Sequence, residues 1–263
     1  MMQSNQKKEQ FTLRAMTYNI HSCVGMDKTV NPERIARVVG AAAPDVVALQ
    51  EVDRGIPRTH LQDQAGLLGD LLEMEAFFFP LVVNGSQKYG LAVLSRLNCL
   101  DIRYNLLPMG YAGLKLNFQQ RGCIQTTLQT PGGPVFFFNT HLSLYRLERR
   151  RQIRALMGND CLEGLPPDAA VIFCGDLNAG PFSPVYQRLS RILSDVQKCL
   201  KTPARPRATY PARRPLFRID HMFVSKNFKV LDVQIASTAG TRLASDHLPI
   251  TAELQLNYRQ GHD

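Results

Sequence analysis

The sequence predicts an α/β (α+β) fold in which mixed β-sheets carry helices on their outer faces. Short apolar runs, typical of buried strands, alternate with amphipathic stretches, typical of helices that cover a sheet. The order of these segments follows neither the strict strand–helix alternation of a parallel sheet nor an unbroken series of hairpins. Sheets that combine parallel and antiparallel pairs fit this order best.

The first elements are marked by clear local signals. Residues 13–20 have the composition of a strand, and Asn31 and Pro32 then provide a cap and a first-turn proline for a helix. That helix is expected to end before Pro44, because the residue before a proline disfavours helical backbone. The apolar run at 46–49 indicates a strand that is covered on both faces.

The rest of the chain repeats this pattern. A Pro-Gly-Gly turn at 131–133 predicts a hairpin between two of the later strands. The same cues predict helices at 61–74, 144–157 and 184–193 and strands at 77–83, 91–94, 123–128, 135–139, 170–174, 220–224, 230–235 and 248–256.

The organisation of the chain favours a single domain. Its 263 residues contain no long Gly/Ser or Pro linker, so we expect one domain over 11–258, with polar tails at 1–10 and 259–263. The first ten residues lack the apolar centre of a signal peptide. No run approaches the roughly 18 to 20 apolar residues of a membrane-spanning helix. The expected location is therefore the cytoplasm.

Composition narrows the chemistry. A net charge of +9 and a pI near 9.4 favour anionic partners, whether nucleic acid, a phospholipid surface or a phosphorylated small molecule. The six cysteines have no Cys-x-x-Cys spacing, and several lie inside apolar runs. We interpret them as buried reduced thiols, not as ligands of zinc or a disulfide framework.

Polar side chains collect where predicted strands begin or end. The ends of strands in an α/β sheet converge on one edge, where ligands bind in such folds. Singly, each position has an ordinary structural explanation, such as a turn cap for Asn19 or a surface carboxylate for Glu51; together they favour a site. The positions are Asn19 with His21, Glu51, His141, Asp176 with Asn178, Asp220 with His221, and Asp246 with His247.

These residue types suit phosphate-ester chemistry. Converging carboxylates repel one another unless cations are present, and their oxygens are ligands for Mg²⁺ or Mn²⁺ in preference to zinc. Such an ion would polarise a phosphoryl oxygen. His247 lies beside a carboxylate that would fix its tautomer, as a base that deprotonates water requires.

The motifs in this order resemble the endonuclease/exonuclease/phosphatase superfamily. This superfamily includes DNase I, AP endonucleases, inositol polyphosphate 5-phosphatases and bacterial sphingomyelinases, and the chain is most similar to its compact bacterial metal-dependent hydrolase type. The similarity spans about residues 13–256. The motifs are Thr17-Tyr18-Asn19-Ile20-His21, Leu49-Gln50-Glu51-Val52-Asp53, Asn139-Thr140-His141-Leu142, Gly175-Asp176-Leu177-Asn178, Arg218-Ile219-Asp220-His221 and Ser245-Asp246-His247-Leu248-Pro249.

The resemblance implies a DNase I-like four-layer sandwich, with two mixed β-sheets face to face and helices outside. Glu51, Asn19 and Asp246 would hold the metal, Mg²⁺ or Mn²⁺. His247, paired with Asp220, would activate the attacking water.

It also implies roles for the remaining candidates. Asp176 and Asn178 would orient the nucleophile and the phosphate, and His141 and Arg121 would contact phosphate oxygens, with Asn178 also binding there. The residues expected to support this site from behind are His21, Asp53 and His221.

The expected function is a divalent-metal-dependent phosphoesterase, with phosphodiester hydrolysis as the leading reaction. The alternatives are a phosphomonoesterase for soluble sugar or inositol phosphates, a sphingomyelinase-like lipid phosphodiesterase, and a non-catalytic protein that binds a phosphate ligand. The sequence departs from AP endonucleases at Val52-Asp53 and at His221, and it contains no Trp. The partner is therefore a phosphate ester from nucleic acid, a lipid headgroup or a soluble phosphate, and no obligatory protein partner is indicated.

Two basic segments have open interpretations. The arginines of the predicted helix at 144–157 fit a solvated face with pairs such as Glu148 with Gln152, or else a surface for phosphates or lipid headgroups. The Pro- and Arg-rich segment 198–218 is either a surface loop or a basic rim beside the site, because it leads directly into Asp220.

Overall fold

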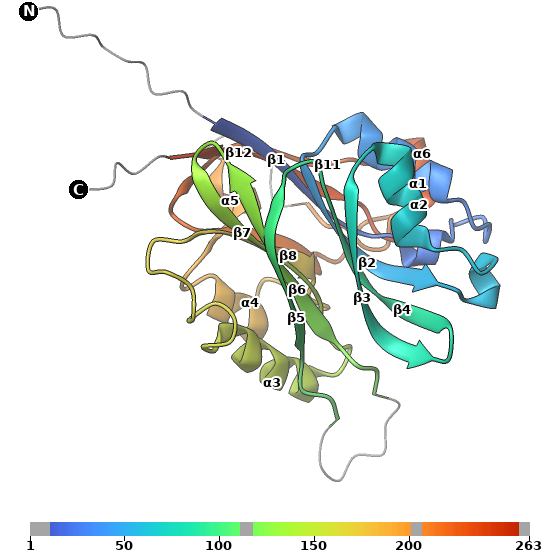
Figure 1. The fold of residues 1–263 in the computed structure, drawn as a ribbon, viewed down its shortest axis with the longest axis horizontal. Helices are drawn as coiled ribbons and strands as arrows, with labels where there is room; N and C mark the ends of the chain where they lie inside the picture. The colour runs from blue at the N-terminus through green and yellow to red at the C-terminus, as the bar shows by residue number, and fades with distance from the viewer. Residues whose placement is uncertain (1–10, 111–117, 201–206, 258–263) are drawn as a thin grey trace, which may run out of the picture.

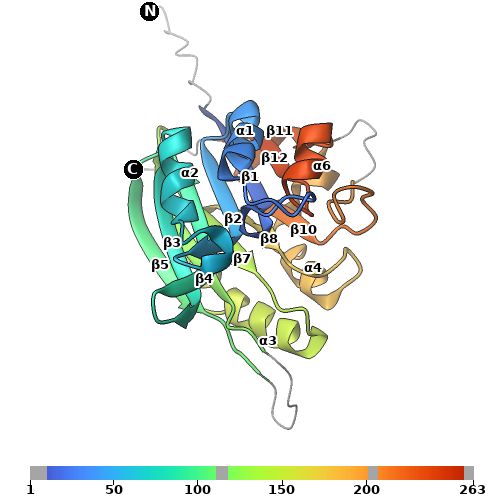
Figure 2. The same cartoon turned by 90° about the vertical axis from the view of Figure 1, so that its right-hand side faces the viewer.

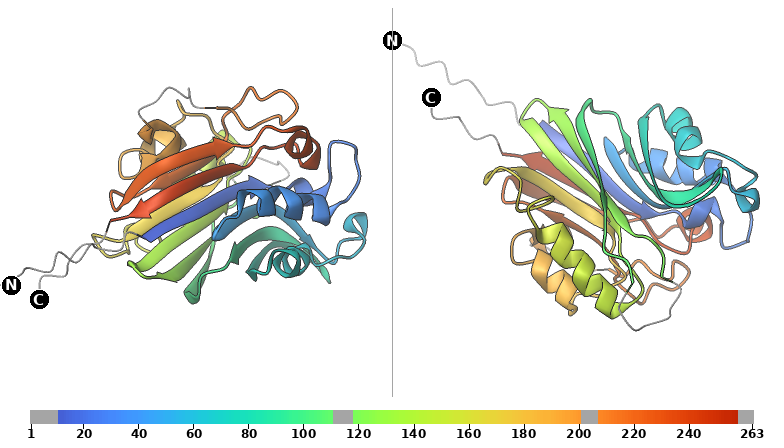
Figure 3. Two further views of the ribbon diagram at one scale, coloured as in Figure 1. Left: turned by 90° about the horizontal axis from the view of Figure 1, so that it is seen from above. Right: turned by 60° about the horizontal axis from the view of Figure 1, so that its bottom comes forward.

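Two six-stranded β-sheets pack face to face, and helices cover both outer faces (Figures 1 and 3). The computed structural model describes residues 11–110, 118–200 and 207–257. The predicted tails at 1–10 and 259–263 lie outside the described residues, as does part of the basic segment 198–218. The predicted four-layer arrangement of the DNase I-like sandwich is confirmed.

The first sheet has a single parallel pair, formed by β1 and β2, and all its other neighbours are antiparallel. Its strands, in spatial order, are β11 (Phe228–Ile235), β12 (Ile250–Leu256), β1 (Phe11–Asn19), β2 (Val46–Arg54), β4 (Gln87–Ser95) and β3 (Glu75–Asn84).

The second sheet repeats this scheme, with β7 and β8 as its parallel pair. Its strands, in spatial order, are β5 (Cys99–Leu106), β6 (Gly122–Thr130), β7 (Gly133–His141), β8 (Ala170–Asp176), β10 (Asp220–Val224) and β9 (Ser194–Asp195). Both sheets are thus mixed, as the order of segments predicted.

Helices form the outer layers. α1 (Pro32–Ala42), α2 (Gln64–Leu72) and α6 (Ala239–Ala244) lie on the side of the first sheet, as Figure 2 shows. α3 (Arg146–Met157) and α4 (Pro184–Leu189) cover the second sheet. The shorter elements are α5 (Val196–Cys199) and the 3₁₀ turns η1 (His21–Cys23) and η2 (Pro57–Thr59).

Strand alternation decides which core each side chain joins. In β2, Val46 and Ala48 face the core between the sheets, whereas Val47 and Leu49 pack under α1 and α2. All four side chains are fully buried, so the prediction of a strand covered on both faces is confirmed. A third core joins the outer face of the second sheet to α3 and α4. Replacing Leu49 with Ala would cost about 2–5 kcal/mol, because the site is enclosed.

Several predicted boundaries are corrected. α1 begins as expected, with the Asn31 side chain accepting a hydrogen bond from the Arg34 amide at 2.7 Å. The helix predicted at 61–74 begins only at Gln64, because Asp63 caps it and Leu61 has a positive φ. The helix predicted at 184–193 ends at Leu189, and the chain then turns into the short strand β9. Strand β5 was not predicted, because its side chains on the sheet edge are mostly exposed.

The arginine-rich helix also differs from its first interpretation. Glu148 and Gln152 are buried and bond to backbone groups, Glu148 to the Gly110 amide and Gln152 to the Ser143 amide. The interpretation of a solvated Glu148–Gln152 pair is therefore wrong: this face of α3 anchors the two loops beside it.

The cysteines form no disulfide bonds. All six cysteines are unpaired, four of them buried, with Cys99 partly exposed and Cys199 exposed. Within the described ranges, no helix has both the length and the apolar character needed to cross a membrane.

Candidate active site

Three neighbouring strands of the second sheet bring polar side chains side by side. His141 closes β7, Asp176 closes β8 and Asp220 opens β10. In the strand register Asp176 pairs with His141 on one side and with Asp220 on the other. This close approach requires Gly175, which has a φ of 142°, because a Cβ there would lie 1.9 Å from the Thr140 carbonyl oxygen.

Glu51 reaches the site from a bulge in the first sheet. The pairing of β2 with β4 shifts register between Gln50 and Val52, and Glu51 has a φ of 59°. A bulge re-aims the side chain of its extra residue, here toward the site. The expectation that Glu51 follows the end of its strand was wrong, since β2 continues to Arg54.

Asn19, the last residue of β1, joins the two halves of the site. Its Nδ2 lies 2.9 Å from Glu51 Oε1 and 3.1 Å from Asp176 Oδ2, so one amide bonds carboxylates from both sheets. Its backbone carbonyl accepts a hydrogen bond from Ser245, and the Ser245 hydroxyl accepts one from the His247 amide. The loop that carries Asp246 and His247 is therefore tied to the end of β1.

Asp176 is the centre of the buried contacts. Its Oδ1 accepts the Asn178 amide at 2.8 Å. Its Oδ2 lies 3.4 Å from His141 Nε2 and 3.8 Å from His247 Nε2. Asn178 has a left-handed backbone with a φ of 48°, and its side chain bonds to the Leu142 carbonyl and to His141 Nε2 at 3.0 Å each.

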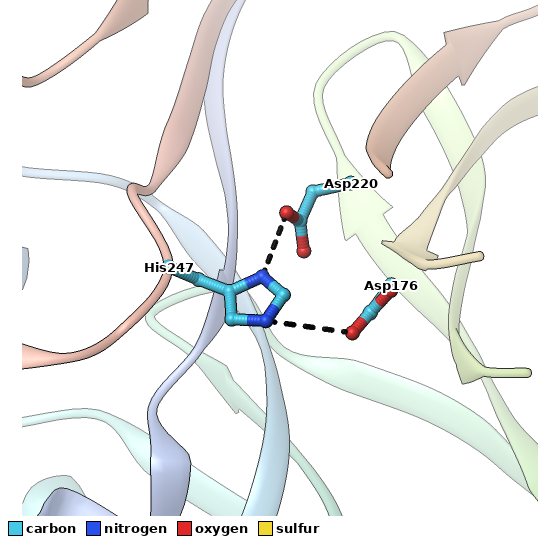
Figure 4. Close-up of side chains that lie close together, drawn as sticks. All are labelled: Asp176, Asp220 and His247. Carbon is cyan, nitrogen blue, oxygen red and sulfur yellow. Dashed lines mark hydrogen bonds and ion pairs between the residues drawn. The ribbon is translucent and has the colours of Figure 1, made fainter. Parts of the chain in front are cut away.

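His247 lies between two carboxylates (Figure 4). Its Nδ1 is 2.8 Å from Asp220 Oδ2, and its Nε2 faces Asp176. The Thr209 hydroxyl donates to the same Asp220 oxygen, and the Tyr210 ring packs against the imidazole with centroids 4.8 Å apart. These contacts fix the orientation of the imidazole and direct Nε2 away from Asp220.

The carboxylates around His247 control its proton. Burial alone would lower the pKa of His247, but Asp220, with Asp176 and Asp246, raises it to about 10. Burial and the charge of Asp220 raise the pKa of Asp176 to about 7. The protein's own charges thus keep a proton on His247 at neutral pH, and a cation that offset them would lower this pKa.

Arg121 and His141 form a second part of the site. Burial and the charge of Arg121 lower the pKa of His141 well below its ordinary value, so this ring is neutral at pH 7. The Arg121 side chain is buried, and its Nε has no hydrogen-bond partner among the described residues. A buried guanidinium with an unused donor is suited to an anion.

The oxygen-rich side of the site fits a divalent cation. Glu51 and Asp246 are partly exposed, and Asn19 alone donates a hydrogen bond to Glu51 within the described part of the chain. These carboxylate and amide oxygens match the preference of Mg²⁺ and Mn²⁺. Asp176, Asp220 and His247 also offer ligand atoms within 4.8 Å of one another and could hold an ion. Because Asp220 and His247 already bond to each other, the partly exposed carboxylates of Glu51 and Asp246 are the more accessible ligands for a cation.

The three residues expected behind the site lie at different depths. His21 is beside Asp246, with His21 Nδ1 4.0 Å from Asp246 Oδ1, and it also bonds to the Val24 carbonyl. His221 is fully buried and bonds to the Ala179 carbonyl, behind the Asp176–Asn178 turn. Asp53 is fully buried and bonds to Arg58 and Ser22, not to the candidate catalytic side chains.

Sequence reasoning missed several residues of the site. Thr209 and Tyr210 belong to the segment that was interpreted as a surface loop or basic rim, and no motif marks them. Arg149 belongs to the helix whose arginines were interpreted either as a solvated face or as a phosphate-binding surface. Its side chain is partly buried, and Asp176 is close enough to act on its pKa, which burial lowers. Within its described part, the segment 198–218 therefore reaches the site through Thr209 and Tyr210.

The chain is similar in sequence and in structure to proteins of one family. The sequence profile of the Endonuclease/Exonuclease/phosphatase family matches residues 16–247. An uncharacterized protein of Escherichia coli K12, YbhP, is 24% identical, and the match covers 94% of this chain and 98% of YbhP.

Two solved structures are similar over most of the chain. The endonuclease/exonuclease/phosphatase from Beutenbergia cavernae has 25% identity and a TM-score of 0.71, covering 94% of this chain and 72% of that one. The mannosyl-6-phosphatase Bt3783 from Bacteroides thetaiotaomicron has 19% identity and a TM-score of 0.75, covering 92% of this chain and 99% of that one.

Proposed function

Because the chain belongs to the endonuclease/exonuclease/phosphatase family, we propose that it is a divalent-metal-dependent phosphoesterase that hydrolyses a phosphodiester with a water activated by His247. The observation that carries this proposal is the position of His247 between Asp220 and Asp176. A histidine with one nitrogen held by a carboxylate and the other free to face a reactant is the arrangement of a general base.

The protein's own residues divide the work. His247 Nε2 would take the proton of the attacking water, and Asp220 would hold the imidazole and stabilise its positive charge. Asp176 Oδ2, which faces Nε2, would orient the water, while Asn178 would bind a phosphate oxygen. Arg121 and neutral His141 would bind the other phosphate oxygens and favour the charge that develops there.

Glu51, Asn19 and Asp246 would hold Mg²⁺ or Mn²⁺. When bound, this cation would polarise the phosphoryl group and stabilise negative charge on the leaving oxygen. The fit rests on the donor atoms, all oxygens, and on the partial exposure of both carboxylates.

Hydrolysis of a phosphomonoester is the second candidate. It is supported by the similarity to the mannosyl-6-phosphatase, a protein named for action on a sugar phosphate.

The cytoplasmic location expected from the sequence stays a prediction.

The test is hydrolysis of bis-p-nitrophenyl phosphate and of p-nitrophenyl phosphate with Mg²⁺, with Mn²⁺ and with EDTA. We expect metal-dependent cleavage that EDTA abolishes and that is faster on the diester. Faster cleavage of the monoester would favour the second candidate. No cleavage of either ester with any metal would contradict the proposal.

A further inference from the structure

A polar pocket of about 320 Å³ adjoins the candidate active site on the side of the first sheet. It shares Glu51 and His21 with that site, and its other walls include Arg58, Tyr89 and Gln119. None of the motifs in the sequence pointed to Arg58 or Tyr89. Because Glu51 borders both spaces, a substrate whose reacting phosphate lies over Glu51 and Asn19 can extend directly into the pocket.

Arg58 is held rigidly at the wall of this pocket. Its Nε and Nη2 each donate a hydrogen bond of 2.9 Å to the two oxygens of Asp53, and Nη2 also lies 3.3 Å from the Ser22 hydroxyl. Asp53 is itself fully buried and is fixed by Ser22 and Thr59. Such a two-bond pair fixes the plane of the guanidinium, so little side-chain entropy remains to be lost when a ligand binds.

The Arg58 guanidinium still has N–H groups that could donate hydrogen bonds to a ligand. The Arg58 side chain is 58% exposed, and its Nη1 makes no hydrogen bond within the described part of the chain. Its Cζ lies 5.9 Å from the centre of the Tyr89 ring, so the two side chains form one wall. The Tyr89 side chain lines the same pocket as Glu51 and carries a hydroxyl that can donate a hydrogen bond.

We propose that this pocket binds a second phosphate group of the substrate, through Arg58 and Tyr89, while the first phosphate is hydrolysed beside it. The proposal rests on the proposed function, because the bound cation would offset the charge of Glu51 in the shared wall. The substrate would then be a phosphate ester that carries a second phosphate a short distance from the reacting one. Bisphosphates of a nucleoside and of a sugar present such a pair of phosphates as ligands.

The test is direct binding, measured by titration calorimetry with Mg²⁺ on the His247→Ala variant, which would not consume its ligands. Two ligand pairs separate the sources: thymidine 5′-phosphate with thymidine 3′,5′-bisphosphate, and fructose 6-phosphate with fructose 1,6-bisphosphate. For at least one pair we expect the bisphosphate to bind about tenfold more tightly, as one charge-assisted contact provides.

Variants in the same background assign that gain to the pocket. Arg58→Lys keeps a positive charge beside Asp53 but loses the planar fork, so we expect the gain to fall to about threefold or less. Tyr89→Phe should reduce it by a smaller factor. Arg103→Gln is the matched control, because Arg103 is also largely exposed and pairs with the neighbouring Asp101 on the edge strand β5. It should leave the gain unchanged. Circular dichroism melting curves would verify that each variant is folded.

Two results would overturn the inference. One is a bisphosphate that binds no better than its monophosphate in both pairs; the other is a gain that survives in folded Arg58→Lys. If the monophosphates bind and wild-type protein cleaves bis-p-nitrophenyl phosphate, either result refutes the pocket alone. If no phosphate binds and no ester is cleaved, the proposed function fails together with it.

Discussion

The two sheets contribute unlike halves to the site. The half from the second sheet, with His141, Asp176 and Asp220, is almost completely buried and each carboxylate is hydrogen bonded. On the other side Glu51, from the first sheet, and Asp246, from the loop before β12, are partly exposed and have few protein partners. A buried and bonded group keeps one geometry and a shifted pKa, as proton transfer requires, whereas an open carboxylate is available to a cation. The comparison predicts that mutations in the two halves will fail in different ways.

The largest effect is expected in the buried half. Asp220→Asn should lower kcat by about 10³-fold, because an amide neither fixes the same tautomer of His247 nor stabilises its positive charge. The requirement for Mg²⁺ should stay close to that of the wild type. Steady-state rates on bis-p-nitrophenyl phosphate, with Asp101→Asn as an exposed control, would measure this. A kcat within tenfold of the wild type would remove Asp220 from the proton-transfer pair.

The buried half should also be sensitive to acid. Burial, with the nearby Arg218, lowers the pKa of His221 to about 4, against roughly 6.5 in an unfolded chain. As the pH falls below about 6.5 only the unfolded state takes up this proton, so stability is lost until the pH reaches the folded-state pKa. At pH 5 the loss is about 2 kcal/mol.

The variant His221→Gln isolates this effect from other titrating groups. Between pH 7.5 and 5, the free energy of unfolding of the wild type should fall by about 2 kcal/mol more than that of the variant. Urea unfolding at each pH would measure the difference. A difference between the two proteins that does not change with pH would show that His221 has the same pKa in the folded and unfolded states.

A smaller and different effect is expected in the open half. Glu51→Gln should raise the Mg²⁺ concentration for half-maximal rate by about tenfold, because an amide oxygen carries no charge for the cation. Activity should return in part at high Mg²⁺. Titration of Mg²⁺ in the rate assay, with the remote Glu253→Gln as control, provides the measurement. An unchanged Mg²⁺ requirement would exclude Glu51 from the metal site.

The parts of the site that could be predicted from the sequence are those formed by residues close together along the chain. Asp176 with Asn178 and Asp246 with His247 are neighbours along the chain, so a short motif describes them. The apolar run at 46–49 likewise predicted a strand covered on both faces, as β2 is. The bulge at Glu51 could not be predicted, because it depends on the register with β4, a strand more than thirty residues away. β5 was missed for a related reason: an exposed edge strand lacks the apolar alternation of a core strand.

Residues whose role depends on tertiary contacts could not be predicted from the sequence either. Thr209 and Tyr210 meet Asp220 and His247 only because the loop folds over β10 and the start of β12. Arg58 depends on Asp53 for its orientation, and nothing in the sequence distinguishes that pair from an ordinary surface ion pair. Such contacts follow from tertiary packing and have no local pattern.

The most direct test of the proposed chemistry is the rate of metal-dependent diester cleavage by His247→Ala. With Mg²⁺ saturating, we expect kcat on bis-p-nitrophenyl phosphate to fall by about 10³-fold or more in a variant that is still folded at the assay temperature, since the imidazole is the proposed base. A variant that is folded and cleaves the diester at a rate close to that of the wild type at neutral pH would contradict the assignment of His247 and, with it, the proposed role of the Asp220–His247–Asp176 arrangement.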